Sequence, residues 1–369
     1  MEIICGLPSS SKRLDCALSI GNFDGVHRGH QALLAQLVCD AHRRGLPSTV
    51  MTFDPHPRTW LALRRGHPEQ APTRIGTLRD KATELRHWGV DRLVVMRFDE
   101  SFSRLPAQSF IDDVLCNAMK ARYMLLGDDF RFGAGREGDT TMLQQAGKLR
   151  GFDVASMASH EVLGLRVSST CIRDELERGN LANTCTLLGR PYEISGRIVR
   201  GSGHGSNLGF PSINLRIGTG APAARGTFVV RIKGAGSTVH AGMGSIGMQQ
   251  TADGRLQPML RVHVWDRLIG PEHRDLGLHV RVEFLHRLHD GQSLGNPECS
   301  PDCVARDVIA ARHWWRCNHR LLERARSAPA DARVLRQAGS HQVNASVLRA
   351  GLLKTTDSLH GDSGGTHYP

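Results

Sequence analysis

The sequence contains few aromatic residues and no long run of basic ones. Phe, Trp and Tyr make up 5% of the 369 residues, and the formal charge of +11 comes from Lys and Arg that stand singly or in pairs such as 43–44 and 64–65. A surface that stacks nucleic-acid bases needs aromatic side chains beside clustered positive charge. The composition therefore argues against a nucleic-acid partner, whereas small anionic substrates fit it at least as well.

The sequence also lacks the segments that direct a chain to a membrane or out of the cell. No stretch approaches the run of about 20 apolar residues that a membrane span needs, and the start, MEIICGLPSSSKRLDC, has no apolar core like that of a signal peptide. The nine cysteines are odd in number and widely spaced, without the two-residue gaps of zinc-binding motifs. We therefore expect a cytoplasmic protein with reduced thiols.

The length exceeds what one hydrophobic core usually fills, so we expect two compact domains. In the first half, short apolar runs predict buried strands at 17–21, 48–53, 92–96 and 123–127. Amphipathic stretches between them predict helices at 33–41, 77–88, 106–117 and 140–148. This alternation predicts a Rossmann-like parallel sheet, whose ligands bind beyond the carboxyl ends of its strands.

After Gly189 the pattern changes to alternating runs rich in glycine. They predict antiparallel strands that close into a small barrel, followed by one helix at about 302–318. We place the domains at 1–186 and 187–322. Residues 323–369 have few large apolar side chains, so we expect a tail without a packed core or a catalytic role.

The segment Gly21-Asn22-Phe23-Asp24-Gly25-Val26-His27-Arg28-Gly29-His30 stands between the first predicted strand and the first predicted helix. Its glycines let the backbone approach a triphosphate, and the start of the helix offers unpaired N–H groups and a positive dipole. His27 and His30 can face one phosphate, and an imidazole can donate to oxygens whose charge grows during nucleotidyl transfer. The segment therefore predicts a phosphate site.

This segment resembles the signature of the nucleotidylyltransferase superfamily, specifically that of the bacterial bifunctional riboflavin kinase/FAD synthetase family. Three further segments resemble that family in the same order, namely FDPHPR (53–58), LLGDDFRFGAGREGD (125–139) and VSSTCIRDELERGNL (167–181). The resemblance covers nearly all of residues 15–185. It implies that the first half transfers AMP from ATP to FMN, with Mg²⁺ sharing the phosphate charge.

The resemblance also implies roles for single residues. His27, His30 and Arg173 would act on the phosphates during the reaction. The nucleotide would be bound by Gly21, Asn22, Asp24, Gly25, Gly29, Ser168, Ser169 and Thr170. The flavin and nucleotide contacts of the family fall at Asp54, His56, Asp128, Asp129 and Phe130.

Residues 189–215 resemble the opening of the family's riboflavin kinase domain. The resemblance implies a glycine-rich loop over the phosphates of ATP, which contains Gly203, Gly205 and Gly209. The family's Pro-Thr-Ala-Asn turn stands here as Pro211-Ser212-Ile213-Asn214. Ser212 and Asn214 keep the hydroxyl and amide oxygens that the turn supplies to Mg²⁺, which prefers such hard ligands.

Several positions depart from the kinase pattern, above all Arg261, which stands where the family has the glutamate taken as the general base. Arginine does not accept a proton at neutral pH, and a general base contributes about 10² to 10⁴ in rate. Glu283 on a neighbouring predicted strand matches a family position that is not catalytic. We therefore expect a second half that binds flavin better than it phosphorylates it.

Two other functions remain open at this stage. A class I aminoacyl-tRNA synthetase shares similar motifs but needs a tRNA-reading domain, for which the glycine-rich barrel is a poor candidate. A non-catalytic paralogue that binds flavin or nucleic acid would fit decay at Ser206, Ser245 and Arg261. The favoured enzyme would use the small molecules ATP, FMN and riboflavin, bind neither nucleic acid nor membrane, and be a monomer or weak homo-oligomer.

Overall fold

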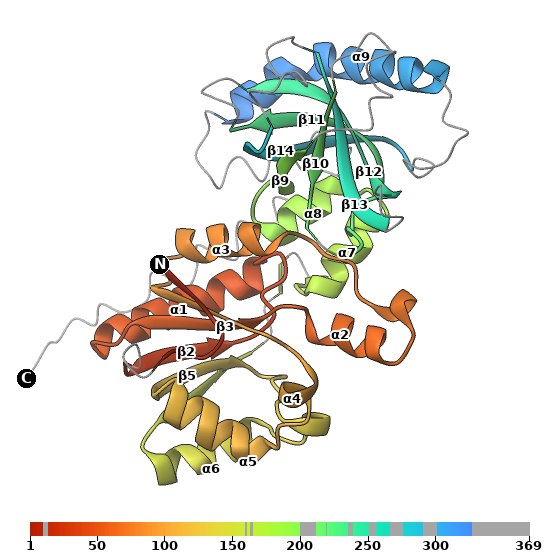
Figure 1. The fold of residues 1–369 in the computed structure, drawn as a ribbon. Helices are drawn as coiled ribbons and strands as arrows, with labels where there is room; N and C mark the ends of the chain where they lie inside the picture. Colours follow the sequence, from red (N-terminus) through yellow and green to blue (C-terminus); the bar gives the residue numbers. More distant parts are fainter. Residues whose placement is uncertain are drawn as a thin grey trace, which may run out of the picture.

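The computed structural model describes residues 1–9, 14–158, 161–162, 165–199, 212–218, 220–234, 239–250, 256–265, 276–290 and 301–326. These residues form a layered α/β region and a closed β-barrel, which lie one above the other in Figure 1. This is the fold class that the sequence predicts. No helix among these residues combines the length and the apolar character that crossing a bilayer requires.

The first region contains a six-stranded, wholly parallel sheet in the order β1-β4-β3-β2-β5-β6. The predicted strands are confirmed as β2 (Cys16–Ile20), β3 (Ser48–Phe53), β4 (Arg92–Met96) and β5 (Ala121–Gly127). Two edge strands, β1 (Glu2–Cys5) and β6 (Asp153–Met157), were not predicted, because their side chains are mostly exposed or half-buried and lack a continuous apolar run. From β2 the chain passes to β3 and β4 on one side, and it then crosses back from β4 to β5 on the other side of β2. This reversal of strand order predicts a crevice for ligands at the carboxyl end of β2.

Helices cover this sheet. They are α1 (Arg28–Arg43), α2 (Pro57–Arg64), α3 (Leu78–His87), α4 (Glu100–Ser103), α5 (Ala107–Ser109), the π-helix η3 (Phe110–Ala118) and α6 (Thr140–Arg150), with single turns η2 (Pro68–Gln70) and η4 (Ala134–Arg136). Local sequence explains their ends: Thr77 and Asp80 form a capping box at the start of α3, and Gly151 ends α6 in the left-handed conformation.

The second region is a six-stranded antiparallel barrel closed in the order β10-β13-β12-β11-β14-β9. Its strands are β9 (Glu193–Val199), β10 (Ser212–Arg216), β11 (Gly226–Lys233), β12 (His240–Gln250), β13 (Leu256–Val264) and β14 (His279–His289). Alternate residues such as Phe228, Val230 and Ile232 fill the interior. The opposite side of β11 packs through Val229 against Val308 and Ala311 of α9 (Pro301–Arg326), a longer helix than predicted.

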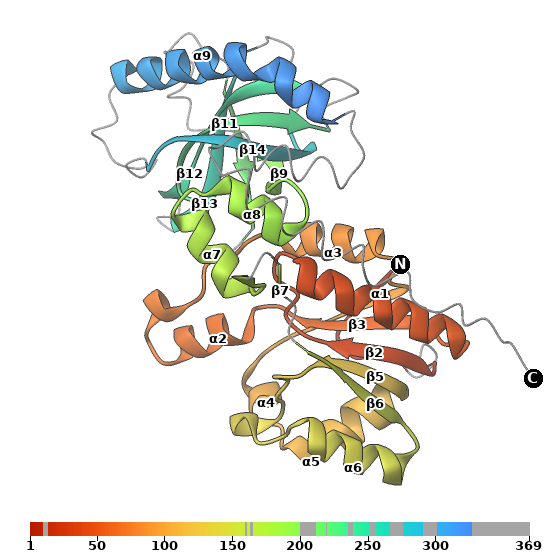
Figure 2. The same cartoon turned by 180° about the vertical axis from the view of Figure 1, so that it is seen from behind.

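Helices α7 (Ser169–Glu177) and α8 (Leu181–Leu188), with the short hairpin β7 (Glu161–Val162) and β8 (Leu165–Arg166), connect the two regions, and Figure 2 shows α7 and α8 between them. Ile75 of the first region lies in the same apolar cluster as the barrel interior. The backbone of Arg74 also pairs with the second region, donating to Ala221 O (2.8 Å) and accepting from Ala223 N (2.9 Å). The two regions are therefore packed together rather than joined by a loose linker.

The predicted domain limits, 1–186 and 187–322, remain predictions. The second limit lies inside α9, which continues to Arg326. Of the expected tail, 323–369, the first four residues belong to α9 and residues 327–369 lie outside the described residues.

We predict that Ile75→Ala lowers the free energy of unfolding by about 2–5 kcal/mol, because it leaves a cavity where both regions meet. Ile75 is 2% exposed, whereas Ile309 on α9 is 67% exposed. Ile309→Ala is therefore a matched control, expected to change stability by less than about 0.5 kcal/mol. Chemical denaturation measures the free energy of unfolding of both variants. Equal losses in the two variants would contradict a core shared by the two regions.

Candidate active site

The predicted phosphate segment forms a tight turn from the end of β2 into α1. Phe23, Gly25 and Val26 all have left-handed backbone conformations, with φ of 46°, 78° and 41°. A β-branched residue such as Val26 adopts this conformation only when its surroundings hold it there. A Cβ added to Gly25 would lie 2.9 Å from Ile75 Cγ2, so only glycine fits. The turn places the first N–H groups of α1, which have no intrahelical acceptor, at the carboxyl edge of the sheet.

The two histidines of the segment stack on each other at this helix start. Their ring centroids lie 3.6 Å apart with planes inclined by 16°. Burial lowers the pKa of His27 to about 4 and that of His30 well below its ordinary value. Both rings are therefore neutral at pH 7. Nδ1 of His27 accepts from the backbone N–H of His30 (3.3 Å), which leaves the proton on Nε2 as a donor.

Several buried polar atoms around the turn have no hydrogen-bond partner among the residues that the structure describes. They are Asn22 Oδ1, Arg28 Nε and His30 Nδ1. Buried polar groups are nearly always hydrogen-bonded in folded proteins. Asn22, Arg28 and His30 belong to the segment that starts α1, so we expect a polar ligand to bind at this helix start.

Asp24 and α7 are joined at the floor of the site. Arg173 donates from Nη2 to Asp24 Oδ2 (2.6 Å) and from Nε to Thr73 O (2.6 Å). Ser169 donates to Asp24 O (3.0 Å), and Ser168 caps α7 by accepting from Cys171 N (3.1 Å). Two of the predicted residues, Ser169 and Arg173, therefore bond the turn, whereas Ser168 caps α7 and Thr170 is exposed.

A cavity beside Asp24 contains a lysine that the sequence did not predict. Lys81 of α3 lines it together with Asp54, His56, Arg74 and Thr77. Its Nζ donates to Thr52 Oγ1 at the end of β3 (3.0 Å), and burial lowers the pKa of Lys81 to about 8. Lys81 belongs to no motif segment, and only the packing of α3 against β3 brings it to the site.

Of the predicted flavin contacts, two lie in this cavity and three lie elsewhere on the sheet edge. Asp54 pairs with Arg74 (2.8 Å), and burial lowers the pKa of His56 to about 4. Asp128 and Asp129 are exposed beyond β5, and Phe130 stacks on Phe132 with centroids 5.8 Å apart. Gly21 and Gly29 lie before and after the turn, as the motif places them.

The predicted metal ligands of the second region lie on the outer side of β10. Asn214 is buried directly opposite Arg261 of β13, and Arg261 Nε donates to Asn214 Oδ1 (3.2 Å). Ser212 stands opposite His263, whose pKa is lowered to about 4 by burial. Gly203, Gly205 and Gly209 lie outside the described residues. Arg261 thus donates to the amide oxygen that the resemblance assigns to Mg²⁺, and the assignment of Ser212 and Asn214 as metal ligands stays a prediction.

Two family models match the chain, one described as FAD synthetase over residues 9–171 and one as riboflavin kinase over residues 188–315. A bifunctional riboflavin kinase/FMN adenylyltransferase of Escherichia coli strain K12 is 38% identical over 318 residues, which span 85% of this chain and 98% of that protein. The chain belongs to this bifunctional family. The protein of the same name from Haemophilus influenzae is 36% identical over 79% of this chain and 91% of its own length.

A solved structure supports the shared architecture of both halves. The crystal structure described as a macrolide-efflux protein from Streptococcus pneumoniae superposes with a TM-score of 0.64 at 27% identity, covering 85% of this chain and all of that chain.

The family models and the curated relatives confirm the resemblance to the riboflavin kinase/FAD synthetase family. The comparisons do not support the expectation of a weakened kinase half, nor the alternative of a non-catalytic paralogue, because both domains match.

Glu283 of the kinase half is held in a buried ion-pair network. Arg231 Nη2 and Lys233 Nζ approach its carboxylate to 2.7 and 2.5 Å, and Lys233 also pairs with Glu193. Glu283 and Arg231 are each 1% exposed. Burial alone would raise the pKa of Glu283, but the two cations hold it below its usual value. This carboxylate is therefore engaged by two structural cations, and its place outside catalysis stays a prediction.

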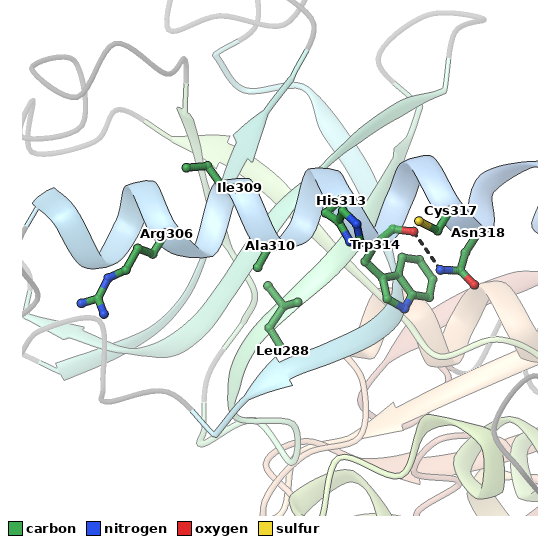
Figure 3. Close-up of a pocket in the computed structure, with 8 residues that line it drawn as sticks. All are labelled: Leu288, Arg306, Ile309, Ala310, His313, Trp314, Cys317 and Asn318. Carbon is green, nitrogen blue, oxygen red and sulfur yellow. Dashed lines mark hydrogen bonds between the residues drawn. The ribbon is translucent and has the colours of Figure 1, made fainter.

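A groove of about 610 Å³ lies on the kinase half, and neither the phosphate segment nor Ser212 and Asn214 line it. Figure 3 shows its lining residues, which come from α9 and from Leu288 at the end of β14. Most are apolar or neutral, and Arg306 is directed toward Cys303 Sγ (3.1 Å). Such a lining does not suit a triphosphate, which needs several cations or N–H donors.

We predict that Glu283→Gln lowers the free energy of unfolding by about 3–5 kcal/mol, because Arg231 stays buried without its counter-charge. Glu177→Gln at an exposed position of α7 is the control, with an expected change below about 0.5 kcal/mol. Denaturant titration at pH 7 measures both variants. Unchanged stability together with lost kinase activity would instead assign Glu283 to catalysis.

Proposed function

We propose that this chain makes FAD in two ATP-dependent steps, phosphorylation of riboflavin by the barrel half and adenylylation of FMN by the α/β half. The observation that supports the second step best is the pair of stacked, neutral histidines at the start of α1, with unpartnered buried polar atoms around them. A neutral imidazole can donate a hydrogen bond to a phosphate oxygen. Unlike a charged side chain, it needs little desolvation when it is buried.

In the adenylyl transfer, a phosphate oxygen of FMN attacks the α-phosphorus of ATP. One P–O bond forms to FMN, the bond from the α-phosphorus to the bridging oxygen breaks, and pyrophosphate leaves with the bonding electrons. No covalent enzyme intermediate is needed, so the protein contributes position and charge stabilisation. ATP enters as its magnesium complex, which brings the cation with the substrate.

Different residues of the site would bind different phosphate groups of the two substrates. His27 and His30 donate to the triphosphate at the start of α1, and Arg173, oriented by Asp24 and Thr73, faces the leaving pyrophosphate. Lys81 lies across the cavity beside Asp54 and His56, where it can bind the phosphate of FMN. Phosphate groups of both substrates would thus meet donors from α1, α3 and α7.

The kinase half would transfer the γ-phosphoryl group of ATP to a hydroxyl of riboflavin. Ser212 and Asn214 are the residues proposed to hold Mg²⁺ there. For Asn214 this requires Arg261 to move from its oxygen. Mg²⁺ would share the charge of the phosphates when bound.

Product analysis tests both steps. The purified protein is incubated with ATP and Mg²⁺, once with riboflavin and once with FMN, and the flavins are separated by chromatography. We expect FAD from both. FAD from FMN but not from riboflavin would mean that the kinase half is inactive. Arg261→Glu would then be the variant to test for restored activity. The absence of FAD from either substrate would refute the proposed function.

We predict that Lys81→Gln lowers kcat/KM for FMN by about 10²-fold, since one donor to a charged phosphate group is lost. With a pKa of about 8, Lys81 is charged below that pH and neutral above it. FAD formation by the unchanged protein should therefore fall as the pH rises through about 8, and Lys81→Arg should remove that decline, because arginine stays charged.

The control is Lys148→Gln on α6, where the side chain is exposed. It removes the same charge far from the cavity and should leave the pH profile unchanged. A Lys81→Gln variant with full activity and the same profile would show that Lys81 does not bind a substrate.

A further inference from the structure

Arg190 follows α8 and stands at the start of the riboflavin kinase match, yet its side chain contacts the phosphate turn of the other half. Its Nη2 donates to Gly25 O (2.7 Å), and its Nη1 donates to Val26 O (3.1 Å) and to Leu188 O (3.2 Å). The remaining donor, Nε, lies 3.2 Å from Glu84 Oε1 of α3. One guanidinium therefore joins α8, α3 and the turn before α1.

The environment keeps this guanidinium in place. The side chain is 28% exposed, and its charge is balanced by Glu84, with Glu193 and Asp80 nearby. Burial lowers the pKa of Arg190, but arginine remains protonated near neutral pH. Its planar set of donors matches neighbouring carbonyl groups in a way that a lysine ammonium does not.

The two contacted carbonyls belong to the strained part of the turn. Gly25 and Val26 have φ of 78° and 41°, and the backbone there needs an external constraint. In a trans peptide the C=O and the following N–H point to opposite sides. Holding the Val26 carbonyl on Arg190 therefore directs the His27 N–H to the opposite face of that peptide, away from the guanidinium.

Gln31 provides a second constraint on the same turn. Its Nε2 donates to Val26 O (2.9 Å) and to Leu188 O (2.7 Å). The carbonyls of Val26 and Leu188 thus each accept from both Arg190 and Gln31. The start of α1 is consequently tied to the end of α8, which packs in the barrel cluster.

We propose that Arg190 is a positioning residue of the adenylyltransferase site, which holds the turn 23–26 so that the start of α1 and its two histidines face the α-phosphate of ATP. This inference rests on the proposed function of the α/β half. It means that the first residues matched to the kinase complete the site that adenylylates FMN. A first domain ending at 186 would lack this constraint.

The test measures FAD formation from FMN in the full chain for Arg190→Met and Arg190→Lys. We expect kcat to fall about 10- to 100-fold in Arg190→Met, the cost of a misplaced reacting group, with the KM for FMN unchanged. Arg190→Lys should recover only part, since it keeps the charge but not both carbonyl bonds. Added guanidinium ion should raise the activity of Arg190→Met and not that of the unchanged protein.

Arg178→Met is the matched control, because Arg178 ends α7 with a side chain that is 71% exposed. It should retain full activity. Gln31→Met should lower kcat in the same direction, and the double variant with Arg190→Met should lose less than the product of the two single effects, because both side chains hold Val26 O.

The outcomes separate the inference from the function on which it rests. No FAD from FMN in the unchanged protein refutes the proposed function itself. An active unchanged protein with Arg190→Met within about twofold of it overturns the positioning role, since such a change is under 0.5 kcal/mol. If Arg190→Met melts early, Arg190→Lys decides: a normal melting temperature with reduced kcat supports the role, and full activity overturns it.

Discussion

The turn from β2 into α1 is the constraint on which the adenylyltransferase half depends. It brings a helix start with free N–H groups to the carboxyl edge of a parallel sheet, and it does so with three residues in the left-handed backbone region. Such a conformation is costly unless the surroundings determine it. Asp24 with Arg173, Gly25 against Ile75, and the carbonyls bonded by Arg190 supply that determination from three different parts of the chain.

Carboxylates and arginines at the site are paired with one another before any ligand binds, and the imidazoles beside them are neutral. Asp24 is paired with Arg173, Asp54 with Arg74, and Glu84 with Arg190. Lys81 has only the Thr52 hydroxyl as a hydrogen-bond acceptor within the described residues, and its depressed pKa reflects that burial. A bound anionic phosphate would stabilise the charged form of Lys81. The arginines are already held in position by their carboxylate partners.

In the kinase half, Arg261 lies across paired strands from the predicted metal ligand Asn214. The antiparallel strands close into a barrel, as the alternating sequence predicts. The guanidinium bonds to the amide oxygen that the family pattern assigns to a metal. Membership of the bifunctional family is clear from both halves, and product analysis with riboflavin tests whether Arg261 permits phosphorylation.

The sequence alone predicted the inner strands of the sheet, the barrel and the segment that stands at the start of α1. Buried strands, amphipathic helices and the GNFDGVHRGH segment are local patterns, and local patterns are readable without a structure. Edge strands, and the lining of the site by Lys81 and Arg190, were decided only by tertiary structure. Arg190 and Gly25 lie 165 residues apart, and neither has a local signal for the other. Such contacts arise when whole helices and strands pack together. A buried arginine or lysine must then be hydrogen-bonded, which fixes its position beside the active site.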